Sequence, residues 1–483
     1  MKTKEKLLAA SVAALMVAFT ACQSQGTVQP PVKQVETTEN QAEKTKDEKI
    51  IKNTNEKPAE DVSTAEDLSS KEFAENVQKR VEAHWPHMSE VWPDHDYEKH
   101  NLILFHVDEN GEPKVAWNIN TKGVNQVDLN KLDIEVPFPG SYSQITYENK
   151  KSIAMSIDDE MIKNLDKSSD ELYKKATHEL VHFYYQDEHM ESSRVANYPL
   201  DKTPRLYRKM IMDNLVKAYK NTDESNKYLS QAKYWYDKWT TEYSDEYNDI
   251  KGTDIDEGTA RYVENIGSFI KPGLSKEEFK KNAIKLINMD EDFVTADAES
   301  YDLGYVTALM LDQKNPNWKD DFYKSKKSLE ELLFKDVEPL KQEVDPDIEK
   351  KVTESIESFN SEVSGYVSNI TKAIDDKSVP YLKINNDENS VFGSGISISY
   401  KEHSIITNYT TNMEVNGKNI DIKGLSLIDD FNDESSSLLV PLDMEYKIEN
   451  EELTIDSEKL KVDGVKVKTE KDESGRTIFV VQK

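Results

Sequence analysis

The spacing of apolar residues changes near residue 376, and this change constrains the fold more than any other feature of the sequence. From about residue 170 to residue 374, apolar residues recur three or four positions apart, the spacing of helices that bury one face. From residue 381 onward, short alternating runs such as 395–400 and 477–481 are separated by Asn, Asp and Gly. Such runs are typical of strands joined by turns. The sequence therefore predicts an α+β chain in which a separate all-β domain, residues 376–483, follows a mainly helical domain, residues 70–375.

The helical domain is expected to begin with a small sheet. Residues 101–107 form an apolar run of strand length, and the hairpin-turn signal Asp-Glu-Asn-Gly follows at 108–111. Further strand-like runs occur at 113–117, 144–147 and 153–157. Helices are expected at 71–81, 170–186, 204–219, 224–247, 257–270, 276–288, 303–313 and 348–374.

The helix expected at 170–186 carries the sequence His178-Glu179-Leu180-Val181-His182. Two histidines four positions apart project from one helix face about 6 Å apart, so both imidazoles can bind one cation. Glu179 then reaches a water molecule on that cation, and this pattern on a helix is typical of a zinc site with a glutamate base. The alternative is a surface helix whose two histidines face solvent.

A catalytic zinc ion needs a third protein ligand and an open position for water. Glu257 is the leading candidate, because it is expected in the first turn of the helix at 257–270 and is followed by the small residue Gly258. Glu188 and His189, six and seven residues after His182, remain alternative ligands.

Two segments resemble a known family. The segment 256–264, Asp-Glu-Gly-Thr-Ala-Arg-Tyr-Val-Glu, resembles the Asn-Glu-Gly-x-x-x-Tyr-x-Glu segment of aminopeptidase-N-like and leukotriene-hydrolase-like gluzincins. This implies that Glu257 is the third zinc ligand and that Glu264 orients a ligand histidine. Tyr301-Asp302-Leu303-Gly304 resembles the Tyr-x-x-Gly helix start of the same enzymes, which implies that Tyr301 stabilises an oxyanion. Here 257 − 182 = 75 residues separate the second histidine from the glutamate, more than in those enzymes.

The resemblance implies a gluzincin-type zinc metallopeptidase with one Zn²⁺ per chain and Glu179 as the base. The Gly-x-Met-x-Asn segment that holds a substrate's free amine in aminopeptidase-N-like enzymes is missing. We therefore expect an endopeptidase, and a strand at 153–157 could bind the extended substrate by edge addition. The alternative is a lipid-anchored binding or adhesion protein with an inactive peptidase fold.

The N-terminus has the composition of a lipoprotein signal peptide. Residues 1–21 contain three early lysines, an apolar stretch and two small residues before Cys22, the only cysteine. This arrangement resembles a lipobox, although Phe19 stands where leucine is usual, and we expect a lipid on Cys22. Residues 22–69 are rich in Glu, Lys, Thr and Gln, contain few aromatic residues and are predicted to form a disordered tether.

The charge excludes one class of partner. With 92 acidic and 62 basic residues the formal net charge is −30, which repels the phosphates of nucleic acids. The expected partner is instead a peptide or protein substrate. From the N-terminal features we expect a monomer outside the cytoplasm, anchored by lipid to a bacterial cell membrane of the Gram-positive type.

The acidic runs 158–160 and 290–292 are interpreted as solvated, with calcium binding as the alternative. Five histidines lack convergent spacing and are interpreted as ordinary residues: His84, His87, His95, His100 and His106.

Overall fold

The computed structural model describes residues 65–132, 134–186, 192, 194–288, 295–386, 394–432 and 435–482. The chain divides into two compact units, residues 1–72 and residues 73–483, and the second contains every element discussed below except the start of the first helix. Among the described residues, no helix is long and apolar enough to cross a lipid bilayer. The predicted signal peptide, Cys22 and most of the predicted tether lie outside these residues.

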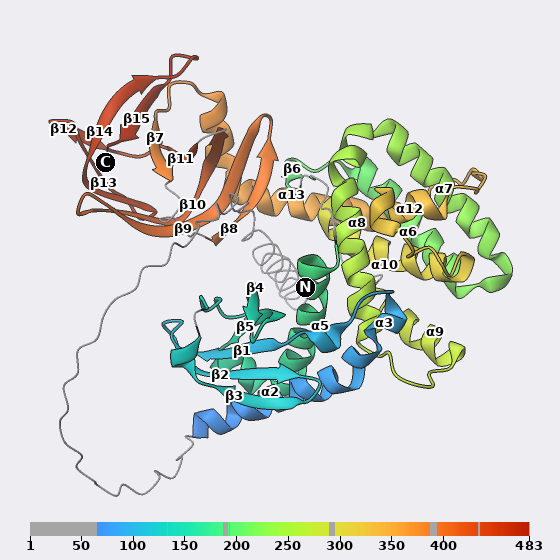
Figure 1. The fold of residues 1–483 in the computed structure, drawn as a ribbon. Coiled ribbons are helices and arrows are strands. Elements are labelled where there is room, and N and C mark those ends of the chain that lie inside the picture. The colour runs from blue at the N-terminus through green and yellow to red at the C-terminus, as the bar shows by residue number, and fades with distance from the viewer. Residues whose placement is uncertain are drawn as a thin grey trace, which may run out of the picture. The chain divides into compact units, whose positions relative to one another are not determined.

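A five-stranded sheet follows the first helix, and its strand order is β3-β2-β1-β5-β4 (Figure 1). Strands β1 and β5 pair in parallel, and the other neighbours pair antiparallel. Every residue of β1 is buried, as expected for an inner strand covered on both faces. The strands span β1 (Leu102–Val107), β2 (Pro113–Asn120), β3 (Gly123–Val127), β4 (Tyr142–Tyr147) and β5 (Lys150–Ile157).

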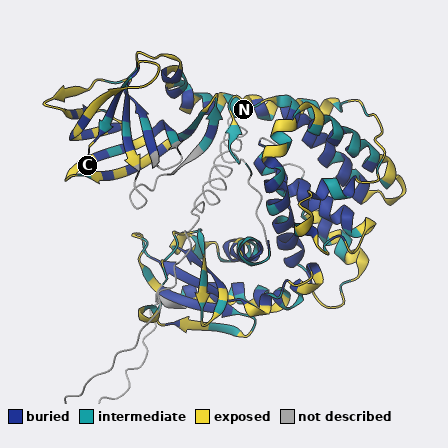
Figure 2. Ribbon diagram, turned by 45° about the horizontal axis from the view of Figure 1, so that its top comes forward, coloured by how far each residue is buried: buried dark blue, intermediate teal, exposed yellow. Residues whose placement is uncertain are grey.

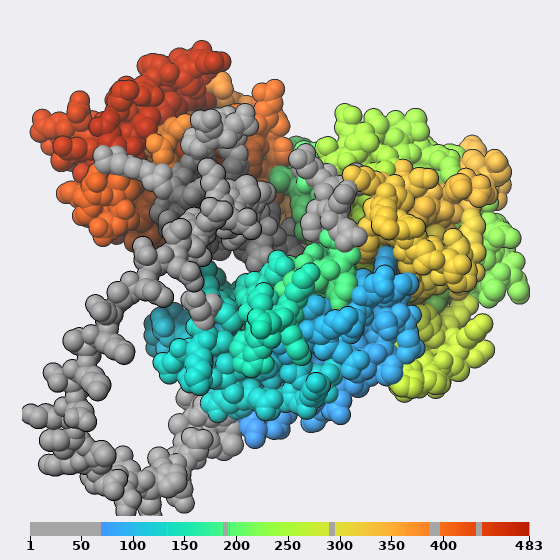
Figure 3. Space-filling model, viewed as in Figure 1, coloured from blue at the N-terminus to red at the C-terminus, as the bar shows by residue number. Residues whose placement is uncertain are grey.

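The expectation that residues 153–157 form an edge strand is wrong. These residues belong to β5, which lies between β1 and β4, so both of its hydrogen-bonding edges are used within the sheet. The edge strand on this side is β4, where exposed and half-buried residues alternate. Atoms of the segment 142–157, teal in Figure 3, lie at the surface in that view.

The helical region is built mainly from long helices whose buried faces meet (Figure 2). The helices are α2 (Ala65–His84), α3 (Met88–Val91), α4 (Asp159–Lys163), α5 (Leu165–Tyr184), α6 (Lys202–Lys220), α7 (Ser225–Glu242), α8 (Ser244–Gly267), α9 (Lys276–Lys285), α10 (Ala296–Lys314), α11 (Phe322–Ser325), α12 (Leu329–Leu333) and α13 (Pro346–Asp375). Short 3-10 turns are η1 (Trp85–His87), η2 (Tyr97–Lys99), η3 (Leu129–Lys131) and η4 (Thr222–Glu224).

Several predicted helix boundaries in this region are wrong. Helix α10 begins at Ala296, so Tyr301 lies inside this helix and not at its start. The helix expected at 224–247 is interrupted at Tyr243, and the helix expected to start near Glu257 is the second half of the continuous helix α8. Glu257 therefore lies well inside a helix and not in its first turn. The two glycines in this stretch, Gly252 and Gly258, lower helix propensity, but both are buried in the packed core, where tertiary contacts outweigh propensity.

The C-terminal part forms a second sheet. Its order is β12-β13-β14-β15-β7-β11-β10-β9-β8-β6, and an additional pairing of β14 with β10 closes part of it on itself around an apolar core. Helix α13 contributes apolar residues to a further cluster with this sheet. The strands span β6 (Ala196–Asn197), β7 (Tyr381–Asn386), β8 (Ser394–Tyr400), β9 (His403–Val415), β10 (Lys418–Asn432), β11 (Ser435–Pro441), β12 (Lys447–Glu449), β13 (Glu452–Asp456), β14 (Leu460–Lys471) and β15 (Thr477–Val481).

The predicted fold class is confirmed. A small N-terminal sheet, a central helical region and a C-terminal β-sheet region follow one another in the chain, as an α+β fold requires. One short strand departs from this order, because β6 comes from the helical region and pairs with β8 of the C-terminal sheet.

Candidate metal centre

Helix α5 carries both histidines of the motif, and buried contacts fix its position. Its apolar residues face the core, and Thr177 receives two hydrogen bonds from buried aromatic side chains, one on its hydroxyl and one on its carbonyl. The indole Nε1 of Trp85 donates to Thr177 Oγ1 at 3.1 Å, and the hydroxyl of Tyr97 donates to the Thr177 carbonyl at 2.8 Å. The residue next to His178 is thus held rigidly.

The second half of the site depends on a close crossing of helices α8 and α10. A Cβ atom added to Gly304 would lie 2.2 Å from the Cα of Gly258, so only glycine allows the two backbones to approach this closely. Glu257 precedes one of these glycines, and Tyr301 lies one turn before the other. The crossing therefore brings the candidate ligand and the candidate oxyanion donor together.

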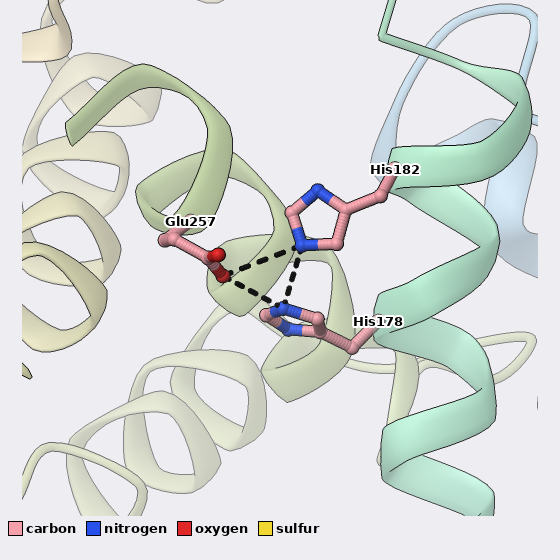
Figure 4. Close-up of side chains that lie close together, drawn as sticks. All are labelled: His178, His182 and Glu257. Atoms are coloured by element: carbon pink, nitrogen blue, oxygen red, sulfur yellow. Dashed lines mark hydrogen bonds and ion pairs between the residues drawn. The ribbon is translucent and has the colours of Figure 1, made fainter. Parts of the chain in front are cut away.

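Three side-chain atoms converge at one point, as Figure 4 shows. The Nε2 atoms of His178 and His182 are 3.0 Å apart, and Glu257 Oε2 lies 3.1 Å from the first and 3.3 Å from the second. Ligand atoms bound to tetrahedral zinc at about 2.0–2.1 Å are about 3.3 Å from one another. His178 and Glu257 are buried and His182 is half-buried, so the three residues form a buried group that can hold a metal ion.

The outer nitrogens of both imidazoles have hydrogen-bond acceptors. His178 Nδ1 lies 3.1 Å from Glu264 Oε2, and His182 Nδ1 lies 2.7 Å from the side-chain oxygen of Gln186. The amide nitrogen of Gln186 donates to the Asp256 carbonyl at 2.7 Å, which turns its oxygen toward His182. With a metal ion bound, each imidazole would therefore hold its proton on Nδ1 and present the lone pair of Nε2.

The pKa values show how strongly this group attracts positive charge. Burial lowers the pKa of His178, but hydrogen bonds with Glu257 and Glu264 outweigh it and raise the pKa to about 10. Burial raises the pKa of Glu257, but the histidines and Arg194 outweigh it and bring the pKa well below its ordinary value. Without a metal ion, a proton is shared among these atoms. A divalent cation satisfies the same three acceptors with more charge.

The remaining predicted residues lie around this group. Glu179 is buried, and burial raises its pKa, while a hydrogen bond from Tyr142 on the edge strand lowers it. The rings of Tyr301 and His178 are stacked with centroids 5.8 Å apart. Glu264 receives hydrogen bonds from Arg261 at 3.0 and 3.2 Å, which hold the carboxylate that faces His178. The chemical roles of Glu179, Tyr301 and Glu264 stay predictions.

Two further residues near the group belong to no sequence motif. Gln186 could have been found, because it lies four residues after His182 on the same helical spacing. Arg194, whose guanidinium bonds Glu257, Asp297 and Tyr301, follows the predicted motif helix in a segment without any recognisable pattern. The alternative ligands Glu188 and His189 lie outside the described residues.

The other metal alternatives gain no support within the described part of the chain. There, His178, His182 and Glu257 are the single group of histidine, cysteine and carboxylate side chains close enough to hold a metal ion. His106 instead contacts Asp159 at 2.8 Å, and Asp158 caps helix α4 through its side chain. The acidic run 290–292 lies outside the described residues.

Comparison with known proteins provides no relative: no protein-family model matches the sequence, and no curated protein and no solved structure matches it significantly. The structural support for the resemblance to gluzincins is therefore the buried His/His/Glu group on a helical core.

Proposed function

We propose that this chain is a zinc-dependent metallopeptidase of the gluzincin kind. One observation carries the proposal: two imidazole nitrogens and a carboxylate oxygen, each able to bind a cation, meet within 3.3 Å on buried helices while both outer imidazole nitrogens are already hydrogen-bonded. With both imidazoles neutral, these three buried atoms would repel one another unless a cation lies between them. Zinc suits a site with two histidines, one glutamate and room for a water molecule.

The mechanism assigns a step to each neighbouring side chain. A zinc ion held by His178, His182 and Glu257 would supply Lewis-acid activation of a water molecule and of the scissile carbonyl. The Glu179 carboxylate accepts a proton from that water and delivers it to the leaving amine nitrogen, a role that its raised pKa favours. The Tyr301 hydroxyl donates a hydrogen bond to the carbonyl oxygen as negative charge develops on it.

The edge strand indicates how a substrate binds. Within the described part of the chain, strand β4 pairs with β5 along one edge only, and its residue Tyr142 hydrogen-bonds Glu179. An extended peptide that pairs with the free edge of β4 would therefore lie beside the proposed base. This suits an endopeptidase, since a chain bound in this way can extend past the scissile bond on both sides. We further propose that a lipid on Cys22 anchors the enzyme as a monomer to the outer face of the bacterial cell membrane.

The alternative function is that of a lipid-anchored binding or adhesion protein with an inactive peptidase fold. Nothing in such a protein would require a buried carboxylate next to the metal group, because a lone buried carboxyl costs stability. Glu179 is 5% exposed. Its burial beside the three acceptors therefore favours the enzyme.

The test is zinc content in purified protein lacking residues 1–22, compared between the wild type and Glu257→Ala. We expect one zinc per chain in the wild type and a large loss in the variant, since only two ligands remain. Asp249→Ala is the matched control, because Asp249 is an exposed carboxylate on the same helix. A wild type without zinc, or a Glu257→Ala variant with unchanged zinc, would overturn the proposed site.

A further inference from the structure

The guanidinium of Arg194 lies beside the metal group and bonds three residues at once. Its Nη1 donates to Glu257 Oε1 at 2.6 Å, its Nη2 donates to the Tyr301 hydroxyl at 3.0 Å, and its Nε donates to Asp297 Oδ1 at 2.7 Å. These partners come from helices α8 and α10, whereas Arg194 belongs to the segment between α5 and α6. One side chain thus joins the candidate ligand to the candidate oxyanion donor.

The two oxygens of the Glu257 carboxylate have different partners. Oε2 faces the histidine nitrogens, and Oε1 accepts the hydrogen bond from Arg194. With its second oxygen held by the guanidinium, Glu257 would hold a cation through Oε2 alone. Such a site would keep room for a water molecule or a substrate on the cation.

The contact with Tyr301 also has a direction. Arginine has only donors, so the phenol oxygen must accept the hydrogen bond from Nη2. Asp297, which is 5% exposed, fixes the plane of the guanidinium through Nε. Arg194 therefore orients both groups toward the same space.

The segment that carries Arg194 is held by the C-terminal part of the chain. Two residues after Arg194, strand β6 pairs in parallel with β8, and the Tyr198 amide donates to the Ser399 carbonyl at 2.7 Å. Further along, the side chain of Asn360 on α13 bonds both backbone groups of Leu200, at 2.8 and 3.1 Å. The backbone after Arg194 is thus fixed to β8 and α13.

We propose that Arg194 is a positioning residue that keeps Glu257 a one-oxygen metal ligand and aims the Tyr301 hydroxyl, and that the C-terminal sheet with α13 holds Arg194 in place. This rests on the proposed peptidase function. In this proposal, the C-terminal β region supports the metal centre through its pairing with β6.

The first test measures metal binding in Arg194→Ala and Arg194→Lys of the protein lacking residues 1–22. We expect the dissociation constant for Zn²⁺, from competition with a chelator, to rise about 10- to 100-fold in Arg194→Ala and less in Arg194→Lys. With Co²⁺ in place of zinc, the visible absorption spectrum of Arg194→Ala should change to that of a higher coordination number. The reason is that Glu257 is then free to bind through both oxygens. Arg80→Ala, which removes another partly exposed arginine–carboxylate pair, is the matched control.

The second test leaves the metal centre itself unchanged. Asn360→Ala removes both hydrogen bonds to Leu200, and we expect a rise of a few-fold in the Zn²⁺ dissociation constant and a lower kcat with little change in KM. Unchanged Zn²⁺ affinity in Asn360→Ala would overturn the support by α13.

The outcomes separate this inference from the proposed function. A wild type that binds no zinc refutes the peptidase assignment. A wild type that binds zinc, together with an Arg194→Ala variant of equal affinity and identical Co²⁺ spectrum, refutes only the positioning role. If Arg194→Ala does not fold, the Co²⁺ spectrum of Arg194→Lys decides, because lysine keeps the charge without the forked geometry.

Discussion

Two buried groups of charged residues share helix α8 and differ in how their charge is neutralised. One is the metal centre, His178, His182, Glu257 and Glu264. The other, here called the arginine cluster, consists of Arg205, Arg208, Asp254 and Glu299. In the arginine cluster, Arg208 binds both oxygens of Asp254 at 3.0 and 2.7 Å, and Arg205 binds Glu299 at 2.6 Å. Every charge there meets an opposite charge from the same chain.

The metal centre lacks this pairing of opposite charges among the three atoms at its centre. Its outer atoms are bonded by Gln186, Arg194 and Arg261, but its three inner atoms face one another, and with neutral imidazoles all three are acceptors. Burial of charge alone therefore does not mark a functional site. The arginine cluster is complete as a structural element, whereas the metal centre is complete only with a cation.

The largest expected effect separates chemistry from stability. Glu179→Gln should lower peptide hydrolysis by about 10³- to 10⁴-fold, because the amide cannot accept the proton from water. Zinc content should stay at the wild-type value, since Glu179 is not one of the three converging residues. Hydrolysis of a quenched fluorescent peptide library measures the effect, and Glu171→Gln, an exposed residue of the same helix, is the control. Full activity in Glu179→Gln would remove the assignment of this base.

The next effect concerns the arginine cluster. Arg208→Met leaves Asp254 and Glu299 without their shared cation, and the loss of one partner of a buried ion pair costs about 3–5 kcal/mol of unfolding free energy. Chemical denaturation measures the loss, and Arg80→Met, which breaks a partly exposed pair, should cost less than about 1 kcal/mol. Zinc per chain should not change under native conditions. If Arg208→Met folds normally but loses zinc, the two groups are coupled and the comparison fails.

The close crossing of α8 and α10 should affect both the metal centre and the arginine cluster. In Gly304→Ala the new methyl group meets the Gly258 backbone at 2.2 Å, so the helices must separate, at a cost of about 1–3 kcal/mol. The same separation should weaken zinc binding, because Glu257 precedes Gly258. Gly365→Ala on α13 is the control: no atom lies within 4 Å of its added Cβ, and alanine should stabilise that helix slightly. Equal stability of Gly304→Ala and the wild type would show that the helices are not in close contact.

The sequence predicts these features unevenly, for physical reasons. The motif helix could be predicted because two histidines and a glutamate are spaced by the helix period itself, which is local information. Glu257 could be placed near them only through resemblance, and its expected position in a first turn was wrong, because the helix is set by tertiary packing at Gly258. The fold class followed from the change in apolar spacing, which is also local.

Contacts between distant segments could not be predicted in this way. Arg194 reaches Glu257 across 257 − 194 = 63 residues, and only the folded chain brings them together. The same holds for β6, whose two residues carry no strand pattern and pair with β8 about 200 residues later. Strand order in the first sheet was likewise missed, because alternation predicts a strand but not its neighbours.

The smallest expected effect is a dependence on pH beside the arginine cluster. Burial, followed by the nearby charge of Asp254, raises the pKa of Glu330 from its ordinary 4.5 to about 7. Between these values the folded chain holds a proton that the unfolded chain has released, so the unfolding free energy falls as pH rises. We expect a fall on the order of 1 kcal/mol from pH 5.5 to pH 7 that Glu330→Gln lacks. The difference between the two proteins at each pH cancels any loss of zinc, and Glu338→Gln, an exposed residue, is the control. Identical pH profiles of Glu330→Gln and the wild type would mean that Glu330 is ionised in the fold, and that the arginine cluster neutralises this carboxylate as well without a bound proton.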